Sequence, residues 1–329
     1  MTQTVQGSGV RGSDAGPRRS FDGLRGNRAL WAFGVLALTW VAAVLFARGF
    51  DSLASVRYLV QTASFLGIVA VGQTLVVMMS GIDLSVSAVV ALSAVVCAQV
   101  AAGSGAAVAI LVALAVSALV GVVNAAGIVW LRLPPMVMTL ASTTVISGAL
   151  LIYTNGSPKS ASIPLLDALA NGSAAGIPLA TVLWLGIAAV AVWLLHLSRL
   201  GAYAFALGTS EPASRASGVP VPVTTLVMYA ACALLAGVAG LVLLGFTGTS
   251  SLTMGNPYQL LSIAAVVLGG TSILGGRGHL LGTVAGALLL TLLTALLVAW
   301  NLSEGLRQVT LGLLIIVLLL LYARERRTA

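Results

Sequence analysis

The chain has 329 residues, of which 59% are hydrophobic and only 7% are charged. An average soluble domain carries about 25% charged residues, so this composition excludes an ordinary soluble protein. The formal net charge is +8, from 16 basic and 8 acidic residues. The basic residues stand at the ends of apolar runs and form no continuous stripe. This distribution argues against a nucleic-acid-binding protein and favours a membrane protein whose basic residues set its topology.

Apolar runs follow one another along the chain, each close to the roughly 20 residues that a helix needs to cross a bilayer. We therefore predict an all-α integral membrane protein with about ten transmembrane helices in one domain, residues 29–322. A segment rich in Gly, Ser and Arg, residues 1–28, precedes this domain and is predicted to be disordered, and a short tail, 323–329, follows it. The predicted spans are 29–47, 58–80, 86–102, 106–130, 136–153, 177–195, 223–245, 258–274, 280–300 and 306–322.

The basic residues also set the expected orientation of these spans. With the N-terminus inside and ten crossings, 12 of the 16 basic residues fall on the cytoplasmic side, in agreement with the excess of Lys and Arg in cytoplasmic loops of membrane proteins. Removing one span would move the loops after it to the other side of the membrane and would remove this excess of basic residues on the cytoplasmic side. We therefore predict an even number of spans, with both termini and both tails in the cytoplasm. The four basic residues left outside are Arg48, Arg57, Lys159 and Arg307.

A polar segment, residues 195–222, interrupts the apolar sequence. It contains Arg199, Glu211 and Arg215, and long apolar runs flank it on both sides. A polar segment of this length must lie in water, and its arginines place it on the cytoplasmic side. We interpret it as the place where a soluble partner grips the membrane protein.

The sequence contains no recognisable constellation of catalytic residues. The phosphate-binding loop of ATPases requires G-x-x-x-x-G-K-[ST], but the one lysine, Lys159, lies in a loop predicted to be outside and does not follow a glycine. His196 and His279 stand at the ends of spans, where ordinary interfacial histidines are expected. Cys97 and Cys232 lie within apolar runs, as is typical of buried apolar side chains. We expect no enzymatic activity, no metal site and no cofactor in this chain.

The connection between the second and third predicted spans carries an acidic residue, Asp83. It lies in the sequence Ser-Gly-Ile-Asp-Leu-Ser, residues 80–85. Gly81 permits a sharp reversal of the chain, and Asp83 can cap the helix that follows, with Ser85 adding local hydrogen bonds. A structural cap is one interpretation. The other is a role in gating or in the solute path, for which Ser80, Asp83 and Ser85 are the candidates.

Uncharged polar residues within the spans are further candidates for a translocation path. Neutral donors and acceptors suit an uncharged polyhydroxy solute, because they exchange hydrogen bonds without trapping a charge. The competing interpretation is hydrogen bonding between helices, which contributes about 0.6 kcal/mol per bond on average in membranes. For any single residue this second interpretation is the favoured one. The candidates are Gln73, Thr74, Asn124, Thr139, Ser142 and Thr143.

Four segments taken together resemble the ribose/xylose-type permeases, the membrane subunits of bacterial ABC importers for simple sugars. They occur in the family's order and spacing over about residues 55–322, and in combination they are highly specific. Two positions depart from the family pattern. Ser87 stands where Gly is usual. Residues 208–212 read Gly-Thr-Ser-Glu-Pro, whereas in the family Asn often follows the glycines of this segment. Pro212 is expected to affect how the following helix starts. The segments are GQTLVVMMSGIDLSVSAVVAL (72–92), GVVNAAGIVWLRLPPMVMTLAS (121–142), GAYAFALGTSEPASRASGVPV (201–221) and YQLLSIAAVVLGGTSILGGRGHLLGTVAGALL (258–289).

The resemblance implies a protein of the bacterial cytoplasmic membrane that works with several partners. In such importers, ATPase subunits that bind ATP and Mg²⁺ clamp a short cytoplasmic helix of the permease. A second permease copy, identical or different, and an extracytoplasmic solute-binding protein complete the assembly. Here the clamped helix would run over about residues 211–218, with an acidic N-terminus and a left-handed glycine end. The implied contact residues are Gly208, Glu211, Ala213, Arg215, Ser217 and Gly218.

The predicted function is therefore import of a pentose- or hexose-like sugar, driven by ATPase subunits that are separate chains. An alternative is a permease of the same superfamily for a nucleoside, an autoinducer or a branched-chain amino acid, because neutral polar linings serve all of these solutes. An ion-driven carrier is less favoured. Such carriers keep ionisable residues within their spans, and the spans predicted here contain almost none.

Overall fold

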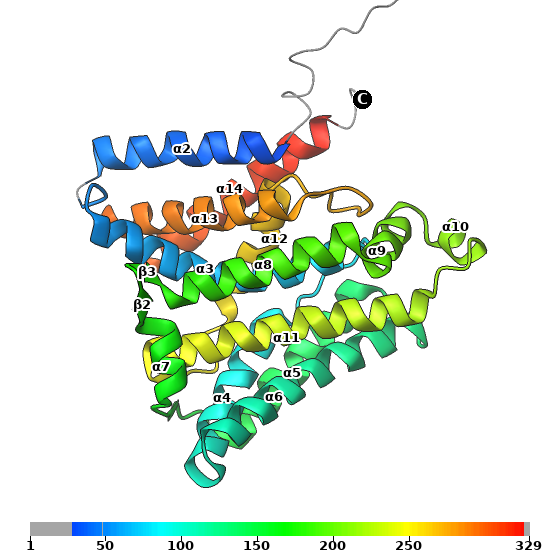
Figure 1. Ribbon diagram of the computed structural model, residues 1–329, viewed down its shortest axis with the longest axis horizontal. Helices are drawn as coiled ribbons and strands as arrows, with labels where there is room; N and C mark the ends of the chain where they lie inside the picture. The colour runs from blue at the N-terminus through cyan, green and yellow to red at the C-terminus, as the bar shows by residue number, and fades with distance from the viewer. Residues whose placement is uncertain (1–27, 48, 326–329) are drawn as a thin grey trace, which may run out of the picture.

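A computed structural model describes residues 28–47 and 49–325. The predicted disordered tail lies outside the described residues except for Arg28, which starts the first helix, and residues 326–329 of the C-terminal tail lie outside them as well. The described chain is almost entirely helical (Figure 1). Its helices are α2 Arg28–Phe46, α3 Leu53–Val77, α4 Val86–Ser104, α5 Ala106–Val129, α6 Pro135–Thr154, α7 Pro164–Asn171, α8 Leu179–Leu197, α9 Arg199–Thr209, α10 Glu211–Ala216, α11 Val221–Thr247, α12 Asn256–Leu268, α13 Leu280–Ala299 and α14 Glu304–Glu325.

Seven of the described helices are long and apolar enough to cross a membrane, namely α3, α4, α5, α6, α8, α11 and α13. This finding confirms the prediction of a helical, multi-pass membrane protein. The remaining predicted spans coincide with α2, α12 and α14. The total of ten crossings and the cytoplasmic location of the two termini stay predictions.

Two elements differ from the predicted boundaries. Helix α12 ends at Leu268, before the end of the predicted span 258–274, because Gly269 and Gly270 follow it and Gly270 adopts a φ of +84° that stops a right-handed helix. With 13 residues, α12 is about 20 Å long, less than the thickness of a bilayer core. The polar loop predicted after the fifth span contains the short helix α7, which buries Leu166 and Ala170.

Helices α3 and α11 are each followed by an eight-residue irregular segment, residues 78–85 and 248–255. The two helices pack against each other in opposite directions at the centre of the bundle (Figure 1), so the two segments enter the bundle from opposite ends. Gly255, at the end of the second segment, lies close to the start of α4, because a Cβ built at Gly255 would lie only 3.0 Å from Ser87 Cα. Helix α4 begins at the buried residues Val86 and Ser87, whereas α12 begins at the exposed residues Asn256 and Pro257.

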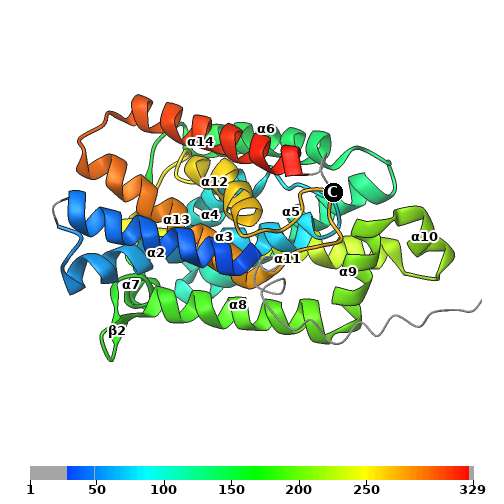
Figure 2. The ribbon, with the colours of Figure 1, turned by 90° about the horizontal axis from the view of Figure 1, so that it is seen from above.

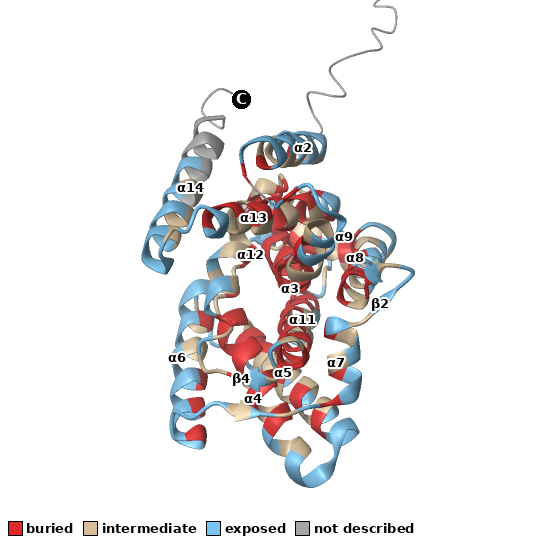
Figure 3. Cartoon of the chain, turned by 90° about the vertical axis from the view of Figure 1, so that its left-hand side faces the viewer, coloured by how far each residue is buried: buried red, intermediate tan, exposed pale blue. Residues whose placement is uncertain are grey.

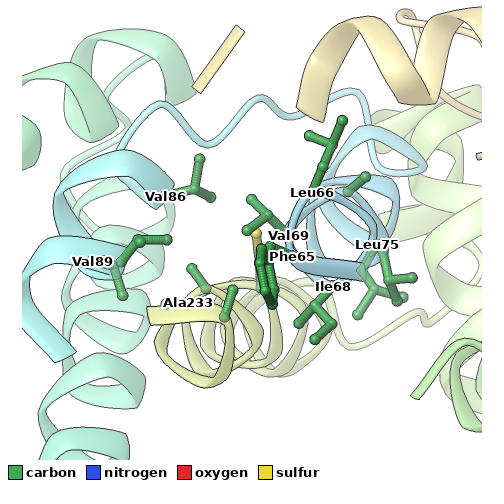
Figure 4. Close-up of a cluster of buried hydrophobic side chains, with 14 of the residues drawn as sticks. Phe65, Leu66, Ile68, Val69, Leu75, Val86, Val89 and Ala233 are labelled. Atoms are coloured by element: carbon green, nitrogen blue, oxygen red, sulfur yellow. The ribbon is translucent and has the colours of Figure 1, made fainter. Parts of the chain in front are cut away.

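The hydrophobic core is centred on α3 and α11 (Figure 3). Phe65 and Val69 lie on the side of α3 that faces Ala233 of α11 and, beyond it, Val86 and Val89 of α4 (Figure 4). The Phe65 ring also contacts Phe246 of α11, with 5.1 Å between the ring centroids. Helices α6 and α14 run along one side of the bundle (Figure 2), and α6 exposes apolar side chains such as Ile152, which is 81% exposed. Such a surface is suited to lipid or to another membrane protein.

Glycines allow the central helices to approach each other closely. A Cβ at Gly121 of α5 would lie 2.7 Å from Ala230 Cα on α11, and one at Gly72 of α3 would lie 3.1 Å from Cys232 Cα. Gly282 and Gly286 of α13 likewise face the backbone of α12 and its C-terminal end. Helices in lipid associate through such close contacts because the hydrophobic effect does not drive them together.

The two ends of the bundle carry different connections. One end holds α7 and two short antiparallel pairs, in which β1 Lys159–Ser160 pairs with β4 Thr249–Ser250, and β2 Ser173–Ala174 pairs with β3 Ile177–Pro178. The other end holds α9 and α10 (Figure 1). The chain's two histidines also meet at that end, with 6.0 Å between the stacked rings of His196 and His279.

Replacing Gly121 by Val is expected to destabilise the protein by about 2–3 kcal/mol, because the added methyl groups would be forced into the α5–α11 contact. Gly186→Val on α8 is the matched control, since no atom lies within 4 Å of a Cβ built there. Thermal unfolding of both variants in detergent measures the difference. Equal melting temperatures would show that the contact between α5 and α11 is looser than described.

Candidate functional site

The segment between α3 and α4, residues 78–85, carries most of the predicted polar candidates. It begins with a tight turn in which Ser80 N–H donates to Val77 O at 2.9 Å and Gly81 N–H donates to Val76 O at 3.1 Å. Ser80 adopts a left-handed conformation, with a φ of +64°. After this turn the chain enters the bundle, where Asp83 is fully buried. The segment therefore brings backbone N–H and C=O groups and a carboxyl group into the interior, where each of them requires a partner.

Asp83 orders the start of α4 through one oxygen. Its Oδ1 accepts hydrogen bonds from Ser85 N at 2.8 Å and from Ser85 Oγ at 2.6 Å. This is the local pattern by which Asp favours a turn at the beginning of a helix. Oδ2 has no hydrogen-bond partner among the described residues. Asp83 thus orders the approach to α4 without capping it as predicted, because Ser85 is the N-cap and no side-chain cap hydrogen bond forms. The role of Asp83 in gating or in the solute path stays a prediction.

Gln73 of α3 holds the backbone of Asp83 at both of its polar groups. In the amide orientation that satisfies both groups, Gln73 Nε2 donates to Asp83 O at 3.1 Å and Gln73 Oε1 accepts from Asp83 N at 3.2 Å. The side chain of Gln73 is itself fully buried. It therefore replaces the neighbouring turn or strand that would satisfy these two groups in regular secondary structure.

Helices α6 and α12 satisfy the next residue of the segment, Leu84. Leu84 N–H donates to Thr139 Oγ1 at 3.1 Å, while Leu84 O accepts from Thr143 Oγ1 at 3.0 Å and from Gln259 Nε2 at 3.2 Å. A second chain of bonds runs from the segment through α5 to α6. Asn124 Nδ2 donates to Ser85 Oγ at 2.9 Å, and Asn124 Oδ1 accepts from Ser142 Oγ.

Most of the predicted path residues thus form one hydrogen-bonded network around residues 78–85. Thr74 lies outside this network, because its hydroxyl pairs with Thr283 of α13 at 3.0 Å. Ser80 is bonded at the outer end of the segment, to Leu274 and Gly208. Sequence reasoning missed Gln259, although a glutamine within the predicted span 258–274 was a visible signal. The network members are Gln73, Asp83, Ser85, Asn124, Thr139, Ser142, Thr143 and Gln259.

The predicted partner-binding segment forms the separate helix α10. Ser210 caps it by accepting from Ala213 N at 3.4 Å, and Pro212 stands in its first turn, where no N–H is needed. The helix ends two residues before the predicted limit: Ser217 is its C-cap, and Gly218 takes a left-handed φ of +79°. Pro212 therefore leaves the start of the helix intact.

The surface of α10 is charged and open to solvent. Glu211 Oε1 accepts from Arg215 Nε at 2.9 Å and from Arg215 Nη2 at 2.7 Å. The side chains of Glu211 and Arg215 are nonetheless 56% and 53% exposed. Ala213 and Ser217 are exposed as well, whereas Gly208 is buried in the preceding helix, α9. Five of the six residues predicted to contact a partner are therefore accessible, and Gly208 is not.

A cleft of about 1030 Å³ separates α10 from the α5–α6 connection. Arg132 lines one wall, Glu211 and Arg215 line the other, and Tyr229 lies among the residues between them. The Tyr229 hydroxyl is buried and has no hydrogen-bond partner among the described residues. Ser80 and Gly81 also line this cleft, so the exposed charges of α10 lie at the same end of the bundle as the start of the segment 78–85.

Residues 55–321 match the protein family described as the permease component of branched-chain amino acid transport systems. The chain belongs to this permease family. The permease is similar to the ribose import permease protein RbsC of Escherichia coli K12, with 39% identity over 239 residues, which cover 70% of this chain and 74% of the relative. No solved structure gives a significant match.

Other relatives of this permease carry different names. It is 30% identical to the fructose import permease protein FrcC of Rhizobium meliloti over 86% of this chain and 82% of the relative. It is 32% identical to the autoinducer 2 import system permease protein LsrC of Enterobacter sp. strain 638, over 92% and 88% of the two chains. The resemblance to ribose-type sugar permeases is confirmed. The prediction of a multi-pass protein of the inner membrane is confirmed as well.

Replacing Gln73 by Leu is expected to destabilise the permease by about 2 kcal/mol or more, because the N–H and C=O groups of Asp83 would both stay buried without a partner. Gln99→Leu, at an exposed position of α4, is the control. Unfolding in detergent, followed by tryptophan fluorescence, measures both variants. A Gln73→Leu variant as stable as the Gln99→Leu variant would contradict the described role of Gln73.

Proposed function

We propose that this permease is the membrane subunit of an ATP-driven importer for a pentose- or hexose-like sugar. The import proteins for ribose and fructose among its relatives support a sugar as the solute. ATP and Mg²⁺ would be bound by partner ATPase subunits, since the sequence has no phosphate-binding loop. A second permease copy and an extracytoplasmic solute-binding protein would complete the transporter.

The observation that carries this proposal is the exposed helix α10. It has its own cap at each end and protrudes from the bundle at the end that also carries Arg132 and Arg199. A short rigid helix gives an ATPase subunit a defined element to hold, and a displacement of that helix can be passed to the spans. Ala213 and Ser217 supply small exposed groups for close contact, and Glu211 with Arg215 supplies charge.

The proposed solute path passes close to the network around residues 78–85. Apart from the carboxyl group of Asp83, its side chains carry hydroxyl and amide groups, which can exchange hydrogen bonds with an uncharged sugar. The contacts from three helices to Leu84 and Ser85 make this segment suited to a gate, because movement of α6 or α12 would break a defined set of bonds. Asp83 would act within the gate through its second oxygen, in addition to ordering α4.

Two alternatives concern the solute and the energy source. Import of an autoinducer is supported by the relatives named for autoinducer 2, and the description of the family keeps a branched-chain amino acid open. A nucleoside is a further alternative, because neutral polar groups suit it as they suit a sugar. An ion-driven carrier is disfavoured by the scarcity of charged residues in the spans.

Glu211→Lys is expected to abolish ATP-driven uptake while leaving membrane insertion intact, because it places a cation beside Arg215 and removes the acidic start of α10. The measurement is uptake of labelled D-ribose, D-xylose and D-fructose into cells that express the complete transporter. Glu304→Lys is the matched control, since Glu304 forms a similar ion pair with Arg307 at the start of α14. Wild-type uptake by the Glu211→Lys variant would refute the role of α10.

A charge-swapped variant, Glu211→Arg with Arg215→Glu, separates two reasons for such a loss. If the pair only stabilises α10, the swap restores uptake, because the ion pair is formed again. If Glu211 contacts the ATPase directly, uptake stays low although α10 is intact. We expect the second result, because both side chains are more than half exposed.

The orientation of the permease can be tested by labelling introduced cysteines. A Ser217→Cys variant is expected to react with a membrane-impermeant maleimide only in inside-out vesicles, and a Ser173→Cys variant only in right-side-out vesicles. The native Cys97 and Cys232 are buried and should contribute little background. The opposite labelling pattern would place α10 outside and would overturn the proposed function.

A further inference from the structure

Three backbone segments from distant parts of the sequence meet at the base of α9. They are the turn after α3, the C-terminal end of α9 and the connection between α12 and α13. We refer to this contact as the backbone junction; it comprises Met78, Ser80, Gly208 and residues 274–276. Gly276 N–H donates to Met78 O at 3.0 Å. The Ser80 hydroxyl donates to Leu274 O at 2.6 Å and lies 3.2 Å from Gly208 O.

The backbone junction leaves no room for a side chain at Gly208. A Cβ built there would collide with the Met78 carbonyl oxygen and the Gly276 amide nitrogen, both of which are backbone atoms that cannot swing away. Gly275 and Gly276 have φ values of +78° and +69°, which are readily adopted only by glycine. The three segments are therefore in direct main-chain contact, and α9 cannot shift without displacing the other two.

Ser80 connects the backbone junction to the network in the interior. It has a positive φ although it is not a glycine, a strained conformation that needs compensating contacts. Its hydroxyl supplies them by bonding to Leu274. Only Gly81 and Ile82 separate Ser80 from Asp83, whose backbone is held by Gln73.

On its other side, the backbone junction leads directly to α10. Gly208 lies in the last turn of α9, and Ser210, the N-cap of α10, follows two residues later. Ser210 N–H donates to Ala206 O at 3.1 Å, so the end of α9 and the start of α10 are joined by a hydrogen bond. A displacement of α10 thus reaches Gly208 through two residues, and it reaches the segment 78–85 through the main-chain contact at Gly208.

We propose that the backbone junction transmits the movement of α10 to the segment 78–85, with Gly208 and Ser80 as its positioning residues. This inference rests on the proposed function, in which an ATPase moves α10. It assigns Gly208 a role different from partner contact: Gly208 keeps α9 and the gate segment in contact inside the protein. Transmission predicts that a change at one end of the backbone junction alters the other end.

The first test needs no partner and no solute. In the purified permease in lipid nanodiscs, Gly208→Ala is expected to speed hydrogen–deuterium exchange of the amides of residues 83–85 by about tenfold, because the bonds that protect them would open more often. Ser80→Ala, which adds no bulk, is expected to produce a smaller increase in the same amides. Gly186→Ala, at a position with free space around it, should leave them unchanged. Unchanged exchange in both junction variants would overturn the inference.

The second test uses the complete transporter with labelled D-ribose. Gly208→Ala and Ser80→Ala are expected to lower the maximal uptake rate, about tenfold or more for Gly208→Ala, while the ATPase subunits still co-purify with the permease. Loss of ATPase binding in both variants would overturn the inference, because the junction would then position α10 for docking only. If the wild-type permease neither binds ATPase nor takes up sugar, the proposed function is wrong. The hydrogen–deuterium exchange experiment still tests whether the backbone junction connects Gly208 to residues 83–85.

Discussion

The structure depends on one constraint: a chain inside a membrane must satisfy its own backbone hydrogen bonds, because no water is present to do so. Helices meet this demand locally, but residues 78–85 leave helical geometry within the bundle. Side chains take over the missing bonds. Gln73 pairs with both backbone groups of Asp83, and Thr139 and Gln259 serve Leu84. The polar residues of an otherwise apolar protein are concentrated where the helix is interrupted.

This arrangement gives each polar contact two physical roles. In the resting protein it stabilises an irregular segment, as expected for hydrogen bonds between membrane helices. During a conformational change the same contacts would have to break and form again, because they join α3, α5, α6 and α12 to one segment. Structural bonding and gating were opposed as interpretations of the sequence. In this geometry a residue such as Thr143 can have both roles. Its hydrogen bond to Leu84 stabilises the segment 78–85, and the same bond would break if α6 moved relative to that segment.

Much of the fold was readable from the sequence, because apolar runs and their flanking residues act locally. The long spans, the left-handed end at Gly218 and the burial of Cys97 and Cys232 follow from such local signals. The end of α12 at Leu268 was missed, since the apolar run continues past the glycine pair that stops the helix. The contacts of Gly208 and Gln259 were also missed. They join segments far apart in sequence, such as Ser80 with Gly208 and Leu84 with Gln259, and spacing within one element cannot reveal them.

The neighbouring starting points of α4 and α12 have an electrostatic consequence. Each helix carries a partial positive charge at its N-terminus, and these two ends converge where Ser87 approaches Gly255. Their combined field favours electron-rich oxygen atoms and repels small cations. It also accommodates the carboxyl group of Asp83, which lies just before the first turn of α4 and has no ion-pair partner in the part of the chain that the structure describes. The region where α4 and α12 begin is therefore polarised by the main chain itself, with hardly any charged side chains.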